Sequence, residues 1–274
     1  MAWVRRELDA LGIPPLKRFG QHFLVDKSVC LRLIELAELT PNDTVLEVGP
    51  GLGLLTAMLA DRAGRVLAIE KDRTLAAYLR DKFSRRRNVT VTEGNALSAQ
   101  IPEGAKIVSS PPYNISSKLI LLIMNSQFRT AALLLQEEFV TRLTAPSGSR
   151  EYGRISVMLQ CKAQAEFHSI IPRDSFYPKP RVDSALVRIR PIREKPPINN
   201  QELFMDMVRT LFTQRRRKLR GVLTRYLKAR YPAQVNILHI ESSLADKRIY
   251  ELNPSELVTL SNQIATAISE SERD

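Results

Sequence analysis

The chain is poor in cysteine and histidine and has no long apolar run. Only Cys30 and Cys161 occur among 274 residues, without a CxxC pair, and the three histidines are not clustered. This argues against a disulfide framework and against a metal site, and it is typical of a reducing compartment. No stretch approaches the roughly 18 apolar residues that a membrane span needs. The first residues carry charge without an apolar core after them, so we expect no secretory signal, no membrane partner and a cytoplasmic location.

Acidic residues are outnumbered by basic ones. The chain has 41 Lys and Arg against 29 Asp and Glu, a formal net charge of +12. Such an excess attracts polyanions through counterion release, although a merely basic protein or one that touches anionic lipid has the same composition. Taken singly, each basic cluster is also compatible with a solvated face, but together they favour nucleic acid. The clusters are Arg85-Arg86-Arg87, Lys179 with Arg181, and Arg215-Arg216-Arg217-Lys218 with Arg220.

The central part of the chain alternates between two patterns. Short β-branched runs at residues 44–48, 66–69, 89–92, 106–109 and 131–136 are separated by helix-like stretches such as 54–62 and 74–83. This alternation predicts an α/β fold with a parallel sheet. Two later runs, 163–171 and 184–190, stand close together around a proline-rich turn, which predicts an antiparallel pair at the sheet edge.

A change of composition suggests two domains. Residues 191–200 are rich in charge and proline, as in a linker, and residues 201–231 and 254–269 have helical periodicity without a strand signal. We therefore expect a domain at residues 1–190, a linker at 191–200 and a small all-helical domain at 201–274.

A glycine-rich turn follows the first strand, at Gly49-Pro50-Gly51-Leu52-Gly53. Alternate glycines let the backbone approach a ligand closely. A dinucleotide fingerprint needs a third glycine three residues after the second, where this chain has Leu54, so NAD is disfavoured. A Gly-x-Gly-x-Gly turn with an acid just before it suits S-adenosylmethionine. Glu47 would then hold the cationic side of that ligand, directly or through water.

Three further strand ends carry polar residues. Glu70 could accept both ribose hydroxyls, Asn95 could hydrogen-bond the adenine edge, and Ser110 begins the tetrad Ser110-Pro111-Pro112-Tyr113. Each has a structural alternative: a surface acid, a turn residue, and a proline turn with a packed tyrosine. Ligands of parallel sheets bind at the carboxyl ends of strands near the switch point. The coincidence of four successive strand ends therefore favours a site.

The tetrad itself predicts a kind of chemistry. The hydroxyl of Ser110 and the carbonyl of Pro111 can both accept from one NH₂ group, with the ring of Tyr113 beside it. Enzymes that methylate the exocyclic amino group of a nucleobase need this arrangement. No strong base is required, because the proton becomes acidic once the nitrogen is alkylated, and His22 is expected to pack or to bind the cofactor.

From about residue 17 to 223, the chain resembles the ribosomal RNA adenine N6,N6-dimethyltransferase family, whose bacterial members confer kasugamycin sensitivity. The resemblance is carried by motifs in the family's order and spacing. They stand at residues 19–24 (Phe-Gly-Gln-His-Phe-Leu), 47–53, 94–97, 110–116, 135–138, 142–143, 152–154, 176–184 and 212–219.

The resemblance implies a Rossmann-like class I methyltransferase sheet with a helical C-terminal domain. It implies S-adenosylmethionine-dependent dimethylation of two adjacent adenosines near the 3′ end of small-subunit ribosomal RNA. The small ribosomal subunit particle would be the partner of a monomeric enzyme, with a role in ribosome biogenesis.

The resemblance also assigns site residues by motif. Ser110, Pro111 and Tyr113 would form the catalytic corner, and Phe176 would stack on the target base. RNA contacts would come from Lys179, Arg181, Arg215, Arg216, Arg217 and Lys218. The cofactor pocket would comprise Gln21, His22, Leu24, Glu47, Gly49, Gly51, Glu70, Lys71, Asn95, Ala96 and Ser110.

The chain departs from the family at two positions. The family usually has Asn in place of Ser110 and Asp in place of Asn95. Both replacements keep an acceptor oxygen, so we expect acceptor function with weaker cofactor contact. Two alternatives stay open: a large-subunit methylase of the erythromycin-resistance type, and a non-catalytic factor for ribosome assembly or mitochondrial transcription. The lack of an Arg- and Ser-rich presequence counts against the mitochondrial version.

Overall fold

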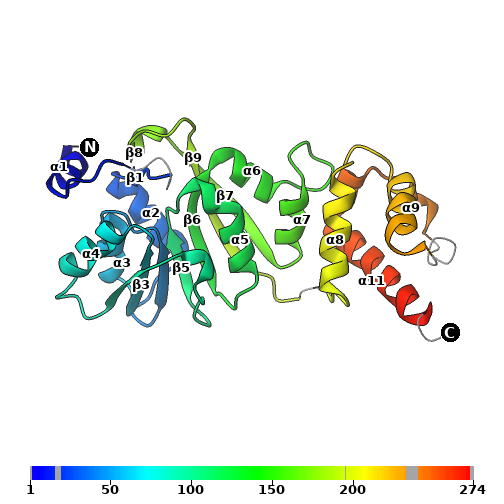
Figure 1. Ribbon diagram of the computed structural model, residues 1–274, viewed down its shortest axis with the longest axis horizontal. Helices are drawn as coiled ribbons and strands as arrows, with labels where there is room; N and C mark the ends of the chain where they lie inside the picture. Colours follow the sequence, from blue (N-terminus) through cyan, green and yellow to red (C-terminus); the bar gives the residue numbers. More distant parts are fainter. Residues whose placement is uncertain (1, 16–19, 195, 233–239, 272–274) are drawn as a thin grey trace. The chain divides into compact units, whose positions relative to one another are not determined.

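The computed structural model describes residues 2–15, 20–194, 196–232 and 240–271. Figure 1 shows the chain, which divides into two compact units. The first unit comprises Met1–Val140 and Ala163–Pro191, and the second comprises Thr141–Lys162 and Ile192–Asp274. Phe19 of the predicted cofactor motif lies outside the described residues.

A seven-stranded sheet forms the centre of the first unit, in the order β4-β3-β2-β5-β6-β9-β7. The ladders that join β4 to β6 are parallel, whereas β9 is antiparallel to both of its neighbours. The predicted α/β sheet and its antiparallel edge pair are therefore confirmed. The strands are β2 (Thr44–Val48), β3 (Arg65–Glu70), β4 (Val89–Glu93), β5 (Lys106–Ser109), β6 (Thr130–Gln136), β7 (Ala163–Ile171) and β9 (Ser184–Pro191).

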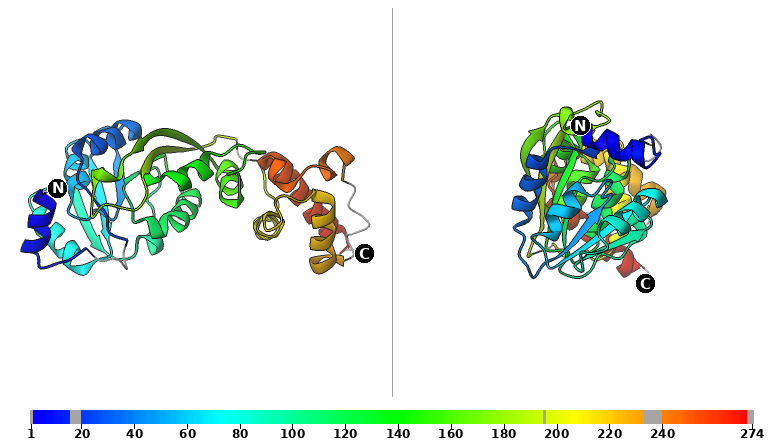
Figure 2. Two further views of the ribbon diagram at one scale, coloured as in Figure 1. Left: turned by 90° about the horizontal axis from the view of Figure 1, so that it is seen from above. Right: turned by 90° about the vertical axis from the view of Figure 1, so that its left-hand side faces the viewer.

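Helices cover both faces of this sheet (Figures 1 and 2). They include α2 (Lys27–Ala37), α3 (Leu54–Ala60), α4 (Arg73–Lys82) and α5 (Ser116–Met124). Helix α1 (Ala2–Ala10) packs against Phe23, Leu52 and Leu75 instead, and α6 (Glu137–Thr144) crosses into the second unit. Two begin at aspartate caps: Asp26 accepts from Ser28 N at 2.8 Å, and Asp72 accepts from Thr74 N at 2.9 Å. Such caps satisfy amide groups that have no partner within the helix.

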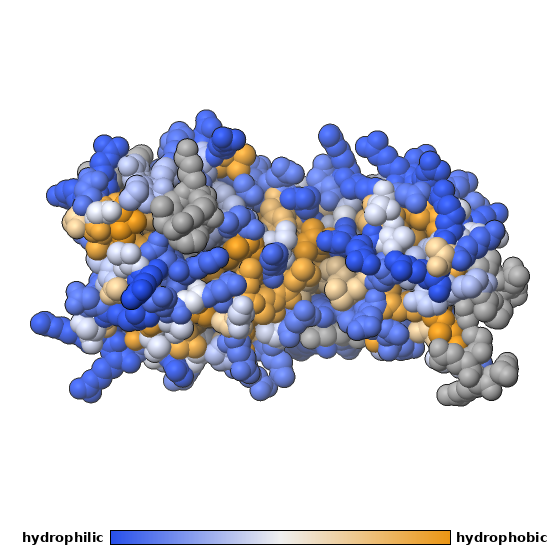
Figure 3. Space-filling model, in the orientation of Figure 1, coloured by the Kyte–Doolittle hydropathy of each residue, from blue (hydrophilic) through white to orange (hydrophobic). Residues whose placement is uncertain are grey.

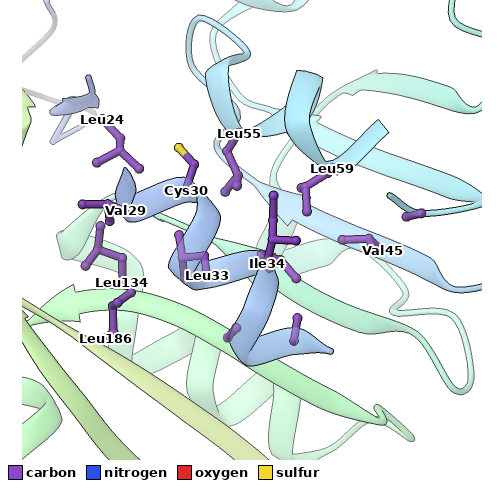
Figure 4. Close-up of a cluster of buried hydrophobic side chains, with 14 of the residues drawn as sticks. Leu24, Val29, Cys30, Leu33, Ile34, Val45, Leu55, Leu59, Leu134 and Leu186 are labelled. Carbon is purple, nitrogen blue, oxygen red and sulfur yellow. The ribbon is translucent and has the colours of Figure 1, made fainter. Parts of the chain in front are cut away.

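The main apolar core lies where α2 packs against α3 and the sheet. Val29, Cys30, Leu33 and Ile34 recur at helical spacing, and all are buried. Figure 4 shows these side chains of α2 directed toward a cluster that includes Leu55, Leu59, Val45, Leu134 and Leu186. The buried stripe holds α2 on one face of the sheet.

Two short strands bring distant parts of the first unit together. β1 (Phe23–Leu24) pairs antiparallel with β8 (Phe176–Tyr177), and Leu24 lies opposite Phe176. The segment that contains Gln21 and His22 therefore lies beside the segment that contains Phe176, although about 150 residues separate them in sequence.

Helix α1 packs against the region that carries the glycine turn. Its buried residues Val4 and Leu8 form one cluster with Phe23, Leu52 and Leu75. The hydroxyl of Tyr78 on α4 also donates to Glu7 Oε2 at 2.8 Å. Helix α1 thus helps to hold Phe23, Leu52 and Leu75 in place.

The second unit is helical in its described part. It contains α7 (Arg154–Gln160), α8 (Gln201–Phe212), α9 (Leu219–Arg230), α10 (Ser242–Ala245) and α11 (Pro254–Ser271). On the face seen in Figure 3, hydrophilic side chains cover much of this unit. Among the described helices, none combines the length and apolar character needed to cross a membrane.

The units differ from the expected domains in one segment. Residues 141–162 belong to the second unit, whereas the sequence placed them in a domain spanning 1–190. Tyr152 is fully buried, and its ring centroid lies 5.8 Å from that of Phe212 on α8. Gly148 N also donates to Tyr250 O at 2.7 Å. These contacts join the segment to helices that follow it by more than 40 residues, so local pattern could not reveal them.

Candidate active site

A cavity of about 380 Å³ opens at the carboxyl ends of the parallel strands of the first unit. It is bordered by the ends of β2, β3 and β5 and by the turn after β4. All predicted cofactor and catalytic residues line it, and their roles stay predictions. They are Gln21, His22, Leu24, Glu47, Gly49, Gly51, Glu70, Lys71, Asn95, Ala96, Ser110, Pro111, Tyr113 and Phe176.

The glycine turn touches the proline corner. Gly49 and Gly51 have φ of 69° and 58°, in the left-handed region that favours glycine. A Cβ at Gly49 would lie 3.0 Å from Pro112 Cδ, and one at Gly51 would lie 2.9 Å from Phe23 Cδ1. Only glycine fits both contacts without displacing a neighbour. The close packing therefore places the turn after β2 directly against the tetrad.

A buried serine joins β2 to β5 where their ladder ends. The paired residues of this ladder end at Leu46 and Ile107. Beyond them, Ser109 Oγ donates to Val48 O at 2.6 Å and accepts from Val48 N at 3.3 Å. This hydroxyl fixes the end of β2 relative to the end of β5, so it holds the glycine turn and the tetrad in register.

Glu47 carries a buried carboxyl group in the cavity wall. The residue is 2 % exposed, and its Oε2 has no hydrogen-bond partner among the described residues. Burial, with a smaller contribution from the nearby Glu70, raises the pKa of Glu47 to about 8. A cationic ligand group beside it would favour the ionised carboxylate, so the unpartnered oxygen is suited to pair with such a group.

Glu70 ends β3 and is engaged on both carboxyl oxygens. Oε2 accepts from Gly51 N at 3.2 Å, and Oε1 accepts from Asp72 N at 2.9 Å. Burial raises its pKa, although the backbone hydrogen bonds oppose that shift. Each oxygen keeps a second lone pair, so the group can still accept from a ligand hydroxyl. The contact with Gly51 couples Glu70 to the glycine turn.

Asn95 is both a turn residue and a cavity residue. It caps the short 3₁₀ turn Ala96–Ser98, and its Oδ1 accepts from Leu97 N at 3.2 Å. The turn alternative is therefore correct for its oxygen. Its Oδ1 keeps a second lone pair and its amide nitrogen stays a donor, so Asn95 can both accept from and donate to a ligand.

The tetrad forms a rigid bend after β5. Ser110 is partly buried, and within the described part of the chain its hydroxyl makes no hydrogen bond. Tyr113 begins the 3₁₀ turn Tyr113–Ile115, and its hydroxyl lies 2.6 Å from Ser184 Oγ at the start of β9. The corner thus offers an accepting hydroxyl beside a ring that is held at both ends.

Three rings gather at this corner. The ring of His22 stacks on Tyr113 with centroids 5.7 Å apart, and Phe176 meets Tyr113 edge-on at 6.4 Å. His22 Nδ1 donates to Pro178 O at 2.7 Å. Phe176 is 1 % exposed, because it also packs into the core. The pairing of β1 with β8 brings these rings together.

Comparison with known proteins decides the family. The family model for ribosomal RNA adenine dimethylase matches residues 16–265. This chain belongs to the ribosomal RNA adenine dimethylase family. The family resemblance seen in the sequence is confirmed, and so is the prediction that the chain is a dimethyltransferase of this class.

Individual relatives agree with the family assignment. A probable ribosomal RNA small subunit methyltransferase A of Thermococcus onnurineus is 41% identical over 258 residues, which are 91% of this chain and 92% of that protein. The structure of the 23S rRNA methyltransferase ErmE is 32% identical, with a TM-score of 0.67, and covers 89% of this chain and 99% of its own. A dimethyladenosine transferase from Plasmodium falciparum (24% identical, TM-score 0.79, 90% and 98% covered) has the same fold.

The basic residues expected to bind RNA differ in their surroundings. Arg215 donates to Ser149 O at 3.3 Å and also to Arg150 O, and its guanidinium lies 5.8 Å from the ring centroid of Tyr250. Arg215 therefore holds the loop before α7 within the second unit. Lys179, Arg181, Arg216, Arg217 and Lys218 are all exposed. Two of them pair with carboxylates: Lys179 contacts Asp174, and Lys218 Nζ lies 3.3 Å from Asp246 Oδ1.

Sequence reasoning missed part of the wall of this cavity. The additional lining residues are Gly20, Phe23, Val48, Pro50, Leu52, Leu54, Leu55, Ile69, Leu75, Gly94, Leu97, Pro112, Asn114, Ile115 and Lys118. Several belong to motifs that carried the resemblance, so they could have been included. Lys118 and Leu75 lie on helices and carry no distinct local signal.

Proposed function

We propose that this chain transfers methyl groups from S-adenosylmethionine to N6 of two adjacent adenosines near the 3′ end of small-subunit ribosomal RNA. It acts as a monomer on the small-subunit particle in the cytoplasm, as a step of ribosome biogenesis. Residues 1–190 carry the chemistry, and the helical domain after the linker at 191–200 holds RNA. The supporting observation is the contact of the glycine turn with the tetrad inside one cavity.

The residues of the cavity fit S-adenosylmethionine. Its ammonium and sulfonium would face the buried Glu47, whose Oε2 lacks a partner among the described residues. Glu70 would accept from the ribose, and the amide of Asn95 would donate to the adenine ring. Gln21, His22, Leu24, Lys71 and Ala96 would complete the pocket around Gly49 and Gly51. When bound, this group supplies an electrophilic methyl.

The corner would prepare the amino nitrogen of adenine for attack. That nitrogen is a poor nucleophile, because its lone pair is delocalised into the ring. Ser110 Oγ and the Pro111 carbonyl would accept its two N–H bonds and localise the lone pair. Fixed acceptors aimed at the developing positive charge contribute about 3 kcal/mol each. The face of Tyr113 adds a cation–π attraction of roughly 0.5–2 kcal/mol.

The orientation of the two reactants would lower the reaction barrier more than these acceptors do. Holding two reactants in line can lower a barrier by about 7–11 kcal/mol. The contact of Gly49 with Pro112 and the hydroxyl of Ser109 fix the two halves of the cavity relative to each other. A paired base cannot enter this corner, so the target adenosine must be extruded from its stack. The ring of Phe176 would then pack on the extruded base.

The choice of ribosomal subunit rests on relatives. Curated relatives at 36% and 41% identity are named small-subunit methyltransferases, whereas the 32% identical ErmE is a 23S enzyme. The higher identities favour the small subunit. The exposed Arg216, Arg217 and Lys218 would contact phosphates, together with Lys179 and Arg181, while Arg215 supports their loop.

One experiment tests the proposal. Purified protein is mixed with labelled S-adenosylmethionine and with unmodified small-subunit particles or, in parallel, unmodified large-subunit particles. We expect label only in the small-subunit RNA, and mass spectrometry should find dimethyladenosine at two neighbouring positions near the 3′ end. Label confined to the large subunit would favour the erythromycin-resistance type. A methylation-deficient variant that fully rescues a deletion strain would support a non-catalytic assembly role.

A further inference from the structure

Ser184 is a fully buried polar residue next to the catalytic corner. It is the first residue of β9, and its backbone lies opposite Gln136 on β6 and Ile171 on β7. Strand pairing on both sides leaves this residue little freedom to move. The backbone that carries its hydroxyl is therefore held in place by both neighbouring strands.

The hydroxyl of Tyr113 lies 2.6 Å from Ser184 Oγ. Burial raises the pKa of Tyr113, so the phenol keeps its proton and can donate it to the serine. At its other end, the ring leaves the backbone in the 3₁₀ turn that follows two prolines. The hydrogen bond thus anchors the far end of a ring whose near end is already restrained.

The orientation of the Tyr113 ring also determines how the two neighbouring rings contact it. His22 stacks on it with an interplanar angle of 27°, and Phe176 approaches its edge at 71°. The hydrogen bond from His22 Nδ1 to Pro178 O fixes the outer ring of this group. If Tyr113 turned, the face offered to the target nitrogen would change, and so would both ring contacts.

We propose that Ser184 is a positioning residue, which holds the ring face of Tyr113 toward the nitrogen that receives the methyl group. This inference rests on the proposed methyl transfer to adenine. Ser184 touches neither substrate in this role; it acts through Tyr113. The alternative is a serine that only fills space in the core.

The test compares four proteins with unmodified small-subunit particles as substrate: Ser184→Ala, Tyr113→Phe, the double variant and the wild type. Each single change removes the same hydrogen bond, from opposite sides. We expect Ser184→Ala to lower kcat by roughly 10- to 100-fold, because small misplacements in a reactive geometry cost that much. The double variant should be no slower than Tyr113→Phe alone.

Two further measurements separate positioning from folding. Donor affinity, measured by calorimetry with S-adenosylmethionine, should change less than twofold in Ser184→Ala, which also shows that the cavity is intact. Ser261→Ala is the matched control, because Ser261 is equally buried but lies in the second unit. Its kcat should equal that of the wild type. Ser184→Thr, which keeps the hydroxyl, should restore most of the rate.

The outcomes are distinguishable. A wild type that labels no ribosomal RNA would overturn the proposed function. An active wild type with full activity in Ser184→Ala, or with independent and additive losses in the two single variants, would overturn the positioning role alone. A parallel loss of donor affinity in Ser184→Ala would assign Ser184 to core packing.

Discussion

At the scale of single residues, Tyr113 carries the sharpest expectation. Its ring lines the cavity and contacts both His22 and Phe176. We expect Tyr113→Ala to reduce methyl transfer by at least about 100-fold, since it removes an oriented group at the reacting nitrogen. Donor affinity, measured by calorimetry, should persist. Tyr177→Ala is the control, because Tyr177 does not belong to the cavity lining. A rate within threefold of the wild type would contradict a catalytic role.

Glu47 links stability to pH. Its carboxyl has an unfolded-state pKa near 4.5 and a folded-state pKa of about 8, so the folded protein binds a proton more tightly than the unfolded chain. This contribution to the free energy of unfolding is present below pH 4.5 and is lost as the pH rises through about 8. We expect Glu47→Gln to show a smaller drop in Tm between pH 6 and pH 9 than the wild type. The exposed Glu103→Gln is the control, and equal drops in all three proteins would refute the assignment.

Neighbouring arginines should have different effects. Arg215 bonds two backbone carbonyls and lies over Tyr250, so Arg215→Ala should lower the free energy of unfolding by about 1–3 kcal/mol. Arg216 is exposed, and Arg216→Ala should change stability by less than about 0.5 kcal/mol. In RNA binding, Arg216→Ala should instead reduce the slope of log K against log salt concentration by about the amount expected for one phosphate contact. Thermal unfolding and titrations at several salt concentrations measure both effects, and a reversed pattern would contradict the assignment.

Residue identities could be predicted better than their partners. All fourteen predicted cofactor and catalytic residues line one cavity. Those at or just after the ends of β2, β3, β4 and β5 lie together because the carboxyl ends of parallel strands meet at one edge of the sheet. The others, Gln21, His22, Leu24 and Phe176, reach the cavity through the pairing of β1 with β8. The sequence could not show that Asn95 Oδ1 is used by Leu97, or that Ser184 meets Tyr113. The second contact joins residues 71 positions apart, which no local pattern encodes.

At the scale of elements, helix α1 packs behind three residues of the cavity wall. Leu8 packs with Phe23, Leu52 and Leu75, all three of which line the cavity. We expect Leu8→Ala to weaken S-adenosylmethionine binding and to destabilise the protein by about 2–5 kcal/mol. Leu257→Ala in α11 is the matched control, because it removes an equally buried leucine from the other unit. It should lower Tm without changing donor affinity, and equal loss of affinity in both would refute the role of α1.

Strands were easier to predict than the elements that join them. The bounds of β2 and β5 match the predicted runs because β-branched residues there are buried on both faces. The pair β1 and β8 has only two residues in each strand, which is too short for any periodicity. Yet this pair brings His22 beside Phe176, so the aromatic side of the site could not be derived from pattern alone.

At the scale of the whole molecule, we expect the two units to have different roles. The cavity lies entirely within residues of the first unit, whereas Arg216 and Arg217 belong to the second. We expect a chain that ends at residue 190 to bind S-adenosylmethionine but to methylate small-subunit particles poorly. It should also unfold at a lower temperature, because Tyr152 loses its contact with Phe212. Calorimetry, label transfer and thermal unfolding measure these effects. A fragment that methylates as fast as the full chain would contradict this division.

Two contacts have a practical consequence for redesign: Gly49 packs on Pro112, and the Ser109 hydroxyl bonds the backbone of Val48. The simplest design for redirecting such an enzyme to another nucleobase would replace the tetrad alone. A tetrad from another enzyme would not fit against the Gly49 turn, which packs closely on Pro112. The methyl donor and the target nitrogen would then no longer be held in line. Residues 48–53 and 109–113 must therefore be transplanted together as a single cassette.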